Sequence, residues 1–357
     1  MLLQHYLQLF PEHEYLMYRV VGFRNFFPDP RLLSFEKKKC RIRTVGLIGR
    51  YANVIRKWVP LDEFFLPDID VFHGNSPYFP SFRKKNKKII LTVHDLIPLV
   101  HPEWSTSTLV NLWVDFAKRF PLLEFDKLSA DSEFTKRDFV NFLKVPPEKI
   151  KVIHLAVDSQ FSQPIPKEKV ASIIKQFELE TGYILTVGTL EPRKNIHRVI
   201  EAYSILKEER KIREKLVITG WKDRTSKPIL EAYEHSKFQE DIRFTGYIPD
   251  SALMALYQGA RVLVYPSLYE GFGLPILEGF ASGVPVVASN SSSLPEVGGD
   301  AVVYVDPYDV HSIAEGIAKV LEDDVLRESL IQKGKHRLKL FSWEKTARET
   351  FALYTMP

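Results

Sequence analysis

The sequence predicts an α/β protein with two Rossmann-like domains that face each other across a cleft. In the second half of the chain, short β-branched runs with few charges alternate with segments of helical spacing, as expected for parallel strands buried on both faces. The first half repeats this alternation less regularly. A length of 357 residues exceeds one ordinary core and suits two domains. Repeated βα units therefore predict two parallel sheets that bind ligands at the carboxyl ends of their strands.

The first half combines an unusual start with five predicted strands. The opening residues MLLQHYLQLF have the pattern of an amphipathic helix, whereas a Rossmann-like domain usually begins with a strand. We therefore expect the first domain to lack its opening strand. The predicted strands cover residues 15–21, 70–74, 87–95, 127–132 and 149–155.

The second half begins after a polar segment, residues 158–169, which contains two prolines and no periodicity and is predicted to be a linker. This places a domain boundary between residues 160 and 161. Helical spacing of Ile196, Val199 and Tyr203 predicts a helix over 195–209. The predicted strands cover residues 183–189, 215–220, 241–248, 261–267, 284–290 and 301–306.

The composition is that of a globular protein outside the membrane, with 45% apolar and 26% charged residues. No apolar run approaches the roughly 20 residues that span a bilayer, and the N-terminus lacks the basic region of a signal peptide. Cys40 is the single cysteine, which excludes an internal disulfide and fits a reducing compartment. These features predict a cytoplasmic protein.

Positive charge concentrates in the first half. Residues 1–160 carry 24 Lys and Arg against 18 Asp and Glu, while residues 161–357 carry 25 against 27. The excess lies in EKKKCRIR (36–43) and FRKKNKK (82–88). These clusters either attract an anionic membrane surface or a phosphate-linked acceptor, or are solvated lysines in loops. No nucleic-acid-binding motif accompanies them, so nucleic acid is not an expected partner.

The stretch EGFGLPILE (270–278) joins a predicted strand to a predicted helix. Gly271 and Gly273 permit a tight turn with accessible amides, and a helix is expected to start near Leu274 or Pro275. A helix N-terminus attracts phosphate, and the flanking carboxylates of Glu270 and Glu278 would accept hydrogen bonds from sugar hydroxyls. The alternative is a glycine turn that opens a surface helix with two solvated glutamates.

A second stretch, VGTLEPRKN (187–195), also ends a predicted strand and opens a predicted helix. Arg193 and Lys194 are adjacent cations where the helix dipole disfavours positive charge. A bound polyanion would resolve this conflict, with Arg193 as a planar fork and Lys194 as a point charge. The alternative is a pair of solvated surface cations. Asn195 is the expected N-cap.

These motifs resemble the retaining GT-B glycosyltransferases of the large group 1 (GT4) family. The two glutamates match the E-x7-E spacing of that family, and PRKN, FTGYIPD and SLPEVGGDAVVYVDP match further segments. The resemblance continues in FHGNSPYFP, TVHDLIPLVHPEW, DSEFTKRD and FSWEKTARETFALY, so it covers most of the chain. It implies two domains, 1–160 on the acceptor side and 161–340 on the nucleotide-sugar side, with a helix over 341–357 returning to the first.

The resemblance also implies roles for individual residues. Arg193 and Lys194 would hold the donor diphosphate, Glu278 the nucleotide ribose and Glu270 the donor sugar near its anomeric carbon. His94 would face that sugar from the first domain. The implied catalytic residues are Glu270, His94, Arg193 and Lys194. The implied donor-binding residues are Gly188, Arg193, Lys194, Tyr247, Gly271, Phe272, Gly273, Leu274 and Glu278, and the acceptor-side residues are His94, Asp95 and Trp104.

The expected activity is retaining transfer of a hexose from a nucleotide-sugar donor to a hydroxyl of a glycan or polyprenyl-linked acceptor. The first half most resembles mannosyltransferases of bacterial surface polysaccharides, which suggests GDP-mannose as donor and a place at the inner face of the membrane. Alternatives are a nucleotide-sugar epimerase, a phosphorylase and a non-catalytic binding subunit.

Neither a metal nor another cofactor is expected. Asp68 and Asp70 have the D-x-D spacing of metal-dependent transferases, but they precede a strand far in sequence from the phosphate-binding stretches. The spacing of His73, His94 and His101 is poor for zinc. The sequence lacks G-x-G-x-x-G after the first strand, which argues against a nicotinamide cofactor.

Overall fold

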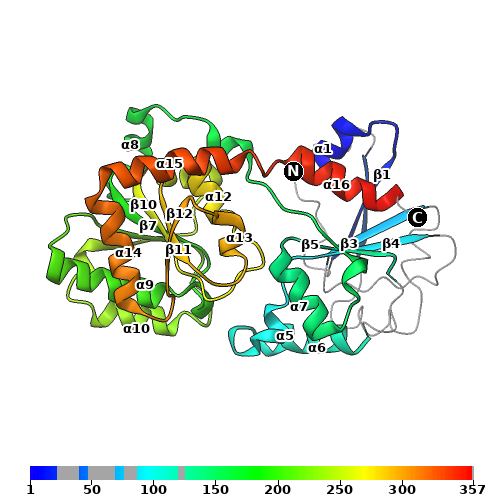
Figure 1. Ribbon diagram of the computed structural model, residues 1–357, viewed down its shortest axis with the longest axis horizontal. Helices are drawn as coiled ribbons and strands as arrows, with labels where there is room; N and C mark the ends of the chain where they lie inside the picture. Colours follow the sequence, from blue (N-terminus) through cyan, green and yellow to red (C-terminus); the bar gives the residue numbers. More distant parts are fainter. Residues whose placement is uncertain (22–39, 47–68, 76–86, 120–124, 356–357) are drawn as a thin grey trace.

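The computed structural model describes residues 1–21, 40–46, 69–75, 87–119 and 125–355. The described strands form a six-stranded, a four-stranded and a two-stranded sheet, and every pairing within them is parallel. The six-stranded and four-stranded sheets lie in separate halves of the molecule (Figure 1). The predicted α/β class with two parallel-sheet domains is confirmed.

The six-stranded sheet holds the second half together, in the order β12-β11-β10-β7-β8-β9. The four central strands are almost entirely buried, which explains their uninterrupted apolar sequences. All six predicted strands are confirmed. They are β7 (Tyr183–Val187), β8 (Leu216–Thr219), β9 (Ile242–Gly246), β10 (Ala260–Tyr265), β11 (Val286–Ser289) and β12 (Val302–Val305).

Helices cover both faces of this sheet. One face packs against α8 (Lys167–Lys175), α11 (Asp250–Gly259) and α12 (Leu274–Ala281), and the other against α9 (Ile196–Ile205), α10 (Lys227–His235) and α14 (Val310–Glu322). The predicted helix over 195–209 is confirmed as α9 and the π-helical turn that follows it, Leu206–Arg210. The remaining elements are α13 (Leu294–Gly298), α15 (Asp324–Leu338) and the 3₁₀ turns Ser159–Ser162, Pro192–Lys194 and Gln239–Asp241.

The four-stranded sheet of the first half has the order β3-β4-β5-β6. Trp113, Phe116 and Phe139 pack helices on one face, and Leu353 of the last helix packs against Ile90 on the other. The strands are β3 (Val71–Asn75), β4 (Lys88–Val93), β5 (Lys127–Ala130) and β6 (Ile150–Val152). The helices are α5 (Ile97–Val100), α6 (Ser107–Arg119) and α7 (Glu133–Leu143), with 3₁₀ turns at Pro102–Trp104 and Pro147–Lys149.

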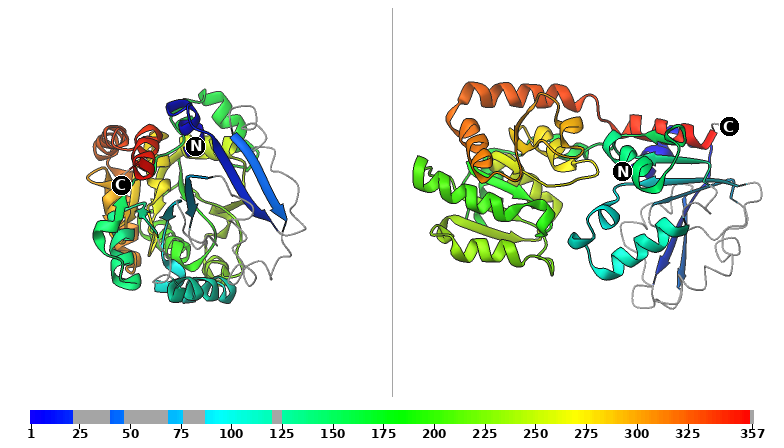
Figure 2. Two further views of the ribbon diagram at one scale, coloured as in Figure 1. Left: turned by 90° about the vertical axis from the view of Figure 1, so that its right-hand side faces the viewer. Right: turned by 60° about the horizontal axis from the view of Figure 1, so that its bottom comes forward.

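The start of the chain forms α1 (Leu2–Leu9), followed by β1 (Tyr15–Val21), which pairs with β2 (Cys40–Gly46). Both strands are visible as a separate ribbon in the left panel of Figure 2. The opening helix and the strand at 15–21 are therefore confirmed. The expected loss of an opening strand stays a prediction.

The last helix, α16 (Trp343–Thr355), returns to the first half, where it contacts α1 and β4 (Figure 1). His73 Nδ1 and the Tyr354 hydroxyl are hydrogen-bonded at 2.7 Å, which fixes this return. The predicted linker at 158–169 is only partly irregular, because α8 begins at Lys167. The domain boundaries after residues 160 and 340 stay a prediction. None of the described helices is long and apolar enough to cross a membrane.

Candidate active site

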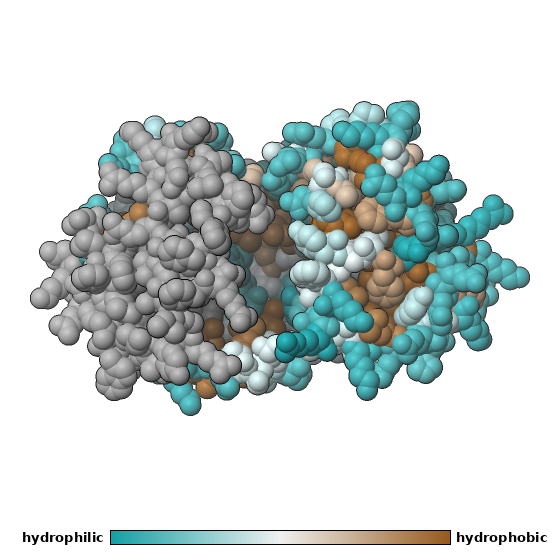
Figure 3. Space-filling view, turned by 180° about the vertical axis from the view of Figure 1, so that it is seen from behind, coloured by the Kyte–Doolittle hydropathy of each residue, from teal (hydrophilic) through white to brown (hydrophobic). Residues whose placement is uncertain are grey.

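The candidate site lies where the two halves meet, and Figure 3 shows the molecule hollowed there. Loops at the carboxyl ends of β7 and β10 supply one wall, and the loops after β4 and β5 supply the other. Parallel sheets place ligand sites at these ends of their strands. The structure thus brings together the stretches 187–195 and 270–278, as predicted, and sets the loop after β4 against them.

A buried carboxylate between two cations forms the centre of the second-half wall. Arg193 Nη1 donates to Glu270 Oε2 at 2.7 Å, and Lys194 Nζ donates to Glu270 Oε1 at 2.7 Å. The Tyr265 hydroxyl also donates to Oε1, at 2.6 Å. A second carboxylate, Glu191, pairs with the other side of Arg193 at 2.7 Å. Glu270 therefore lies inside the cationic pair and orients it.

The charges of this cluster shift one another's pKa. Burial by itself would raise the pKa of Glu270, but the charges of Lys194 and Arg193 outweigh it and lower this pKa to about 2. Burial lowers the pKa of Lys194, with Glu270 acting in the opposite sense. Glu270 is therefore ionised at neutral pH and lies between the side chains of Arg193 and Lys194.

The local chain geometry explains why these cations occupy this place. Gly188 follows β7 with φ of +135°, and a Cβ there would lie 3.2 Å from Lys194 Cε, so the lysine stem runs along the glycine. Arg193 and Lys194 end the 3₁₀ turn just before α9, as predicted. Asn195 occupies the N-cap position of α9, as predicted, but its side chain does not cap an α9 amide. Its Nδ2 donates to the carbonyls of Pro266 and Pro307, and its Oδ1 accepts from Arg198 Nη1.

The glycine turn 271–273 lets the two walls approach closely. A Cβ on Gly271 would lie 1.9 Å from the carbonyl oxygen of His94, so any larger residue would push the loops apart. At the start of α7, the hydroxyls of Ser132 and Thr135 donate to the Gly271 carbonyl at 2.7 and 3.0 Å. Gly273, with φ of +107°, is the N-cap of α12, which starts at Leu274 as predicted.

Glu278 lies in α12 with an environment opposite to that of Glu270. Its Oε2 accepts from the Tyr257 hydroxyl at 2.6 Å. Burial raises the pKa of Glu278, with the Tyr257 hydrogen bond and Lys194 acting in the opposite sense. The two glutamates therefore do not form an acid pair, in agreement with the prediction from their spacing.

His94 and Asp95 form the first-half wall, directly after β4. His94 Nδ1 lies 2.6 Å from Asp131 Oδ2, and its side chain is 50% exposed. Asp95 accepts from the backbone amide of Ile97 at 3.0 Å and is close enough to Arg193 and Glu270 to feel their charges. Burial raises the pKa of Asp95. The catalytic residues that the sequence predicts thus meet around one space.

Comparisons with known proteins agree with this geometry. Residues 169–337 match the family model "Glycosyl transferases group 1", and residues 11–161 match "Glycosyltransferase Family 4". Over 287 residues the chain is 34% identical to the O-antigen chain mannosyltransferase B of Escherichia coli, covering 80% of this chain and 74% of that relative. This chain is a group 1 glycosyltransferase.

Further similarities support the family and the fold. The serotype-specific mannosyltransferase WbdA of Escherichia coli is 31% identical over 294 residues, 78% of this chain, but the chain spans only 35% of that relative's length. A solved glycosyltransferase from Rickettsia africae superposes with a TM-score of 0.73 at 19% identity, covering 96% of this chain and 98% of its own. The structure of Anabaena HepE, solved with UDP and glucose, superposes with a TM-score of 0.74 at 14% identity, covering 97% of this chain and 100% of that chain. The GT-B fold prediction is confirmed.

Three predicted residues lie at the margins of the candidate site. Trp104 stacks on His101 with centroids 3.9 Å apart, and His101 meets the edge of Tyr269 in the loop before Glu270. Tyr247 follows β9 and is 66% exposed. Phe272 is buried against Phe341, so only its backbone is left to meet a donor.

Sequence reasoning missed several residues that shape the site. Tyr265 was assigned only to a strand, although its hydroxyl contacts both Lys194 and Glu270. Asp131 opens the motif DSEFTKRD, in which the sequence indicated no role for it. Glu296 accepts from the amide of Glu133 at 2.9 Å and from His154 Nε2 at 2.7 Å, which joins α13 to the start of α7. A polar residue at the end of a buried strand was the available signal for Asp131.

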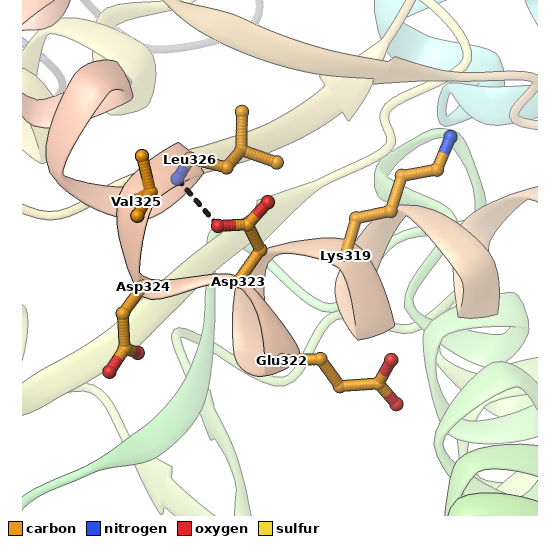
Figure 4. Close-up of a pocket in the computed structure, with 6 residues that line it drawn as sticks. All are labelled: Lys319, Glu322, Asp323, Asp324, Val325 and Leu326. Carbon is orange, nitrogen blue, oxygen red and sulfur yellow. Dashed lines mark hydrogen bonds between the residues drawn. The ribbon is translucent and has the colours of Figure 1, made fainter.

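The described residues bear only in part on the predictions about metal sites and basic clusters. Within them, no group of three or more His, Cys, Asp and Glu could hold a metal ion. Asp68 and most of the basic clusters 36–43 and 82–88 lie outside the described residues. His73 bonds Tyr354 and Thr92, and His101 bonds Glu103. A separate hollow at the α14–α15 junction is lined by Lys319, Glu322, Asp323, Asp324, Val325 and Leu326 (Figure 4), none of which belongs to the candidate site.

Proposed function

We propose that this glycosyltransferase transfers mannose from GDP-mannose, with retention at the anomeric carbon, to a hydroxyl of a glycan or polyprenyl-linked acceptor in surface polysaccharide synthesis. The names of two relatives support the sugar and the pathway, since one is an O-antigen chain mannosyltransferase and the other a serotype-specific mannosyltransferase. The Glu270–Arg193–Lys194 cluster is the observation that carries the reaction type.

The cluster suits the departure of a nucleoside diphosphate. Breaking the bond from sugar to phosphate develops negative charge on the leaving group, and fixed cations beside that group lower the barrier. Lys194 and Arg193 are held by Glu270 before any donor binds, so little reorganisation would be needed. The N-terminus of α12 and the amides of Gly273 and Leu274 would add donors to the diphosphate.

The two glutamates then take different parts of the donor. Glu278, anchored by the Tyr257 hydroxyl, would accept hydrogen bonds from the ribose hydroxyls. Glu270 would contact the sugar beside its anomeric carbon. Its oxygens are occupied by Arg193, Lys194 and Tyr265, which makes it a poor nucleophile. A same-face transfer, in which the leaving phosphate accepts the proton of the acceptor hydroxyl, fits this arrangement and gives retention.

The proposal is tested by incubating the protein with GDP-mannose and mannose-terminated oligosaccharides, without added metal and then with Mg²⁺. Proton NMR of the product would read the anomeric configuration. An α-linked mannoside formed without metal, from a donor that is itself α-linked, supports the proposal. Donor binding with no transfer to any acceptor would favour a non-catalytic binding subunit, and conversion of the donor sugar alone would favour an epimerase.

The place of the reaction is part of the same proposal. A polyprenyl-linked acceptor would bring the protein to the inner face of a membrane. The basic clusters of the first half would attract anionic lipids there. Co-sedimentation with vesicles of phosphatidylcholine, with and without phosphatidylglycerol, tests this part, since binding only to the anionic vesicles would support it.

A further inference from the structure

The first-half wall contains a buried acid beneath the imidazole of His94. Asp131 directly follows β5, and its side chain is 3% exposed. Its Oδ2 lies 2.6 Å from His94 Nδ1. A carboxylate accepts hydrogen bonds and donates none, so Nδ1 carries the proton of this bond. Nε2 is therefore the nitrogen of His94 that is left for a ligand.

The place of Asp131 is set by backbone structure. β4 and β5 pair in parallel with Val93 opposite Ala130, so the residues that follow, His94 and Asp131, emerge side by side at the same sheet edge. Ser132, the next residue, caps α7 by accepting from the amide of Thr135 at 3.0 Å and donates to Gly271 across the cleft. Asp131 is thereby held in place by the β5 strand before it and by the α7 cap after it.

Burying a carboxylate costs several kcal/mol unless a donor satisfies it, so Asp131 is an expensive residue for a purely structural position. The described contact that satisfies it is the imidazole of His94, which is itself 50% exposed. A buried acid that serves a half-exposed imidazole is the arrangement in which the acid sets the orientation and charge of the base.

We propose that Asp131 is a positioning residue for the transfer reaction: it fixes the His94 imidazole through Nδ1–H and presents Nε2–H as a charged donor to an oxygen atom of the sugar diphosphate. This inference rests on the proposed function, which puts the sugar diphosphate between the two walls. The carbonyl of His94 lies against Gly271, in the loop that carries Glu270, so His94 lies beside that space. The reaction develops negative charge on that diphosphate, and an imidazolium would stabilise it more than a neutral ring.

The charges around His94 agree with this role. The hydrogen bond that His94 donates to Asp131 raises the pKa of His94, burial acts in the opposite sense, and the charges of Asp131 and Asp95 add to the rise. His73, the neighbouring imidazole, has its pKa lowered to about 4 by burial and then by His94, so it is neutral near pH 7. Burial raises the pKa of Asp131, with the His94 hydrogen bond and the charges of His94 and His154 acting in the opposite sense.

The test compares Asp131→Asn with the wild-type chain by two readouts. In ¹⁵N-histidine NMR, the His94 signals, identified by their loss in His94→Gln, report the tautomer and the titration. Wild type should carry its proton on Nδ1 when neutral, and Asp131→Asn should lower the His94 pKa. Glu148→Gln, which removes an exposed acid from the same half, should change neither.

The second readout is transfer from the nucleotide sugar. Asp131→Asn should lower kcat/KM about tenfold, the size of one charge-assisted hydrogen bond, and should move the basic limb of the pH profile to lower pH. In a His94→Gln background, the same change should cost less than about twofold, because the two residues act as a unit. GDP carries the same diphosphate, so Asp131→Asn should weaken the binding of GDP as well.

Opposite results would overturn the proposal. An unchanged His94 titration in Asp131→Asn would show that the acid does not set the state of the ring. An equal loss of activity with and without His94 would make Asp131 a structural residue, and a melting temperature lowered in parallel would show the same. A wild-type chain that transfers no sugar would defeat the proposed function, whereas the NMR titration would still decide whether Asp131 fixes and charges His94.

Discussion

The two walls of the cleft solve the problem of buried charge in different ways. On the second-half wall, Glu270 is enclosed by Arg193, Lys194 and Tyr265, so each charge already has a partner. On the first-half wall, one buried acid, Asp131, supports a half-exposed imidazole. In the first arrangement the charges are paired with one another, and in the second an imidazole is left half exposed. In the proposed function, the first wall would supply fixed charge and the second a proton-dependent donor.

The largest expected effect comes from removing a fixed charge. Lys194→Met keeps the stem that lies along Gly188 but removes the ammonium beside Glu270. The transfer rate should fall by about 10²- to 10³-fold, the usual cost of removing one preorganised donor to a developing anion. Because Glu270 loses a buried partner, stability should also fall, by about 3 kcal/mol. Steady-state kinetics and urea unfolding measure both, with Lys345→Met, an exposed lysine of α16, as control.

The next effect separates the walls without changing a charge. Gly271→Ala places a Cβ against the His94 carbonyl, and the loops must move apart by more than an ångström to relieve the 1.9 Å approach. A misplacement of this size in an active site costs about 100-fold in rate. Gly283→Ala places a Cβ that meets no atom within 4 Å, although at a left-handed glycine with φ of +71°, and serves as the control for a Gly→Ala change without a steric contact. Equal rates for the two variants would show that the close approach is unnecessary.

A smaller effect is expected at the contact that joins α13 to α7. Glu296→Gln removes the charge that accepts from the Glu133 amide and from His154. Hydrogen bonds to charged groups contribute about 1.5–3 kcal/mol, so the variant should unfold more easily by about that amount. The KM for the donor should rise. The affinity for GDP, which is expected to contact mainly the second half, should persist. Unchanged stability and KM would mean that this contact does not hold the walls together.

The walls should respond to pH in opposite directions. The folded pKa of Glu270, about 2, is below its ordinary value of 4.5, so its stabilisation is complete above pH 4.5 and is lost as the pH falls toward 2. The folded pKa of His94 is raised above its ordinary value of 6.5, so its stabilisation is complete below that pH and is lost as the pH rises through the folded pKa. Urea midpoints of wild type, Glu270→Gln and His94→Gln across pH 3–9 would reveal both slopes.

The smallest effect concerns the exposed aromatic pair at the ends of β8 and β9. Trp221 is 67% exposed and lies 5.5 Å, centroid to centroid, from Tyr247. Tyr247→Ala should change stability by less than about 0.5 kcal/mol, as surface substitutions do. If Tyr247 borders the nucleobase, GDP affinity should fall severalfold. Unchanged affinity in calorimetry would remove it from the donor site.

The sequence predicted the second half better than the first, for physical reasons. Strands such as β7 and β10 are buried on both faces, so their sequences are continuous apolar runs. Arg193, Lys194 and Glu270 were found because glycine turns and helix starts mark ligand sites locally. Asp131, Tyr265 and Glu296 were missed because their roles depend on partners 5 to 163 residues away, which no spacing rule encodes. Asn195 takes the predicted N-cap position without a side-chain capping bond, because tertiary contacts engage its side chain.

The most direct test of the account is a calorimetric titration with GDP-mannose, GDP, UDP-glucose and UDP, without metal, on wild type and Glu278→Ala. A ligand that binds the native state also raises its melting temperature. The account predicts that GDP-mannose and GDP bind wild type more tightly than UDP-glucose and UDP. GDP-mannose should release more heat on binding than GDP, because its mannose would contact His94 and Glu270. Glu278→Ala should weaken the binding of all four ligands at least tenfold. Equal binding to wild type and Glu278→Ala, or no binding by any of the four, would contradict the central claim that a nucleotide sugar lies between these walls.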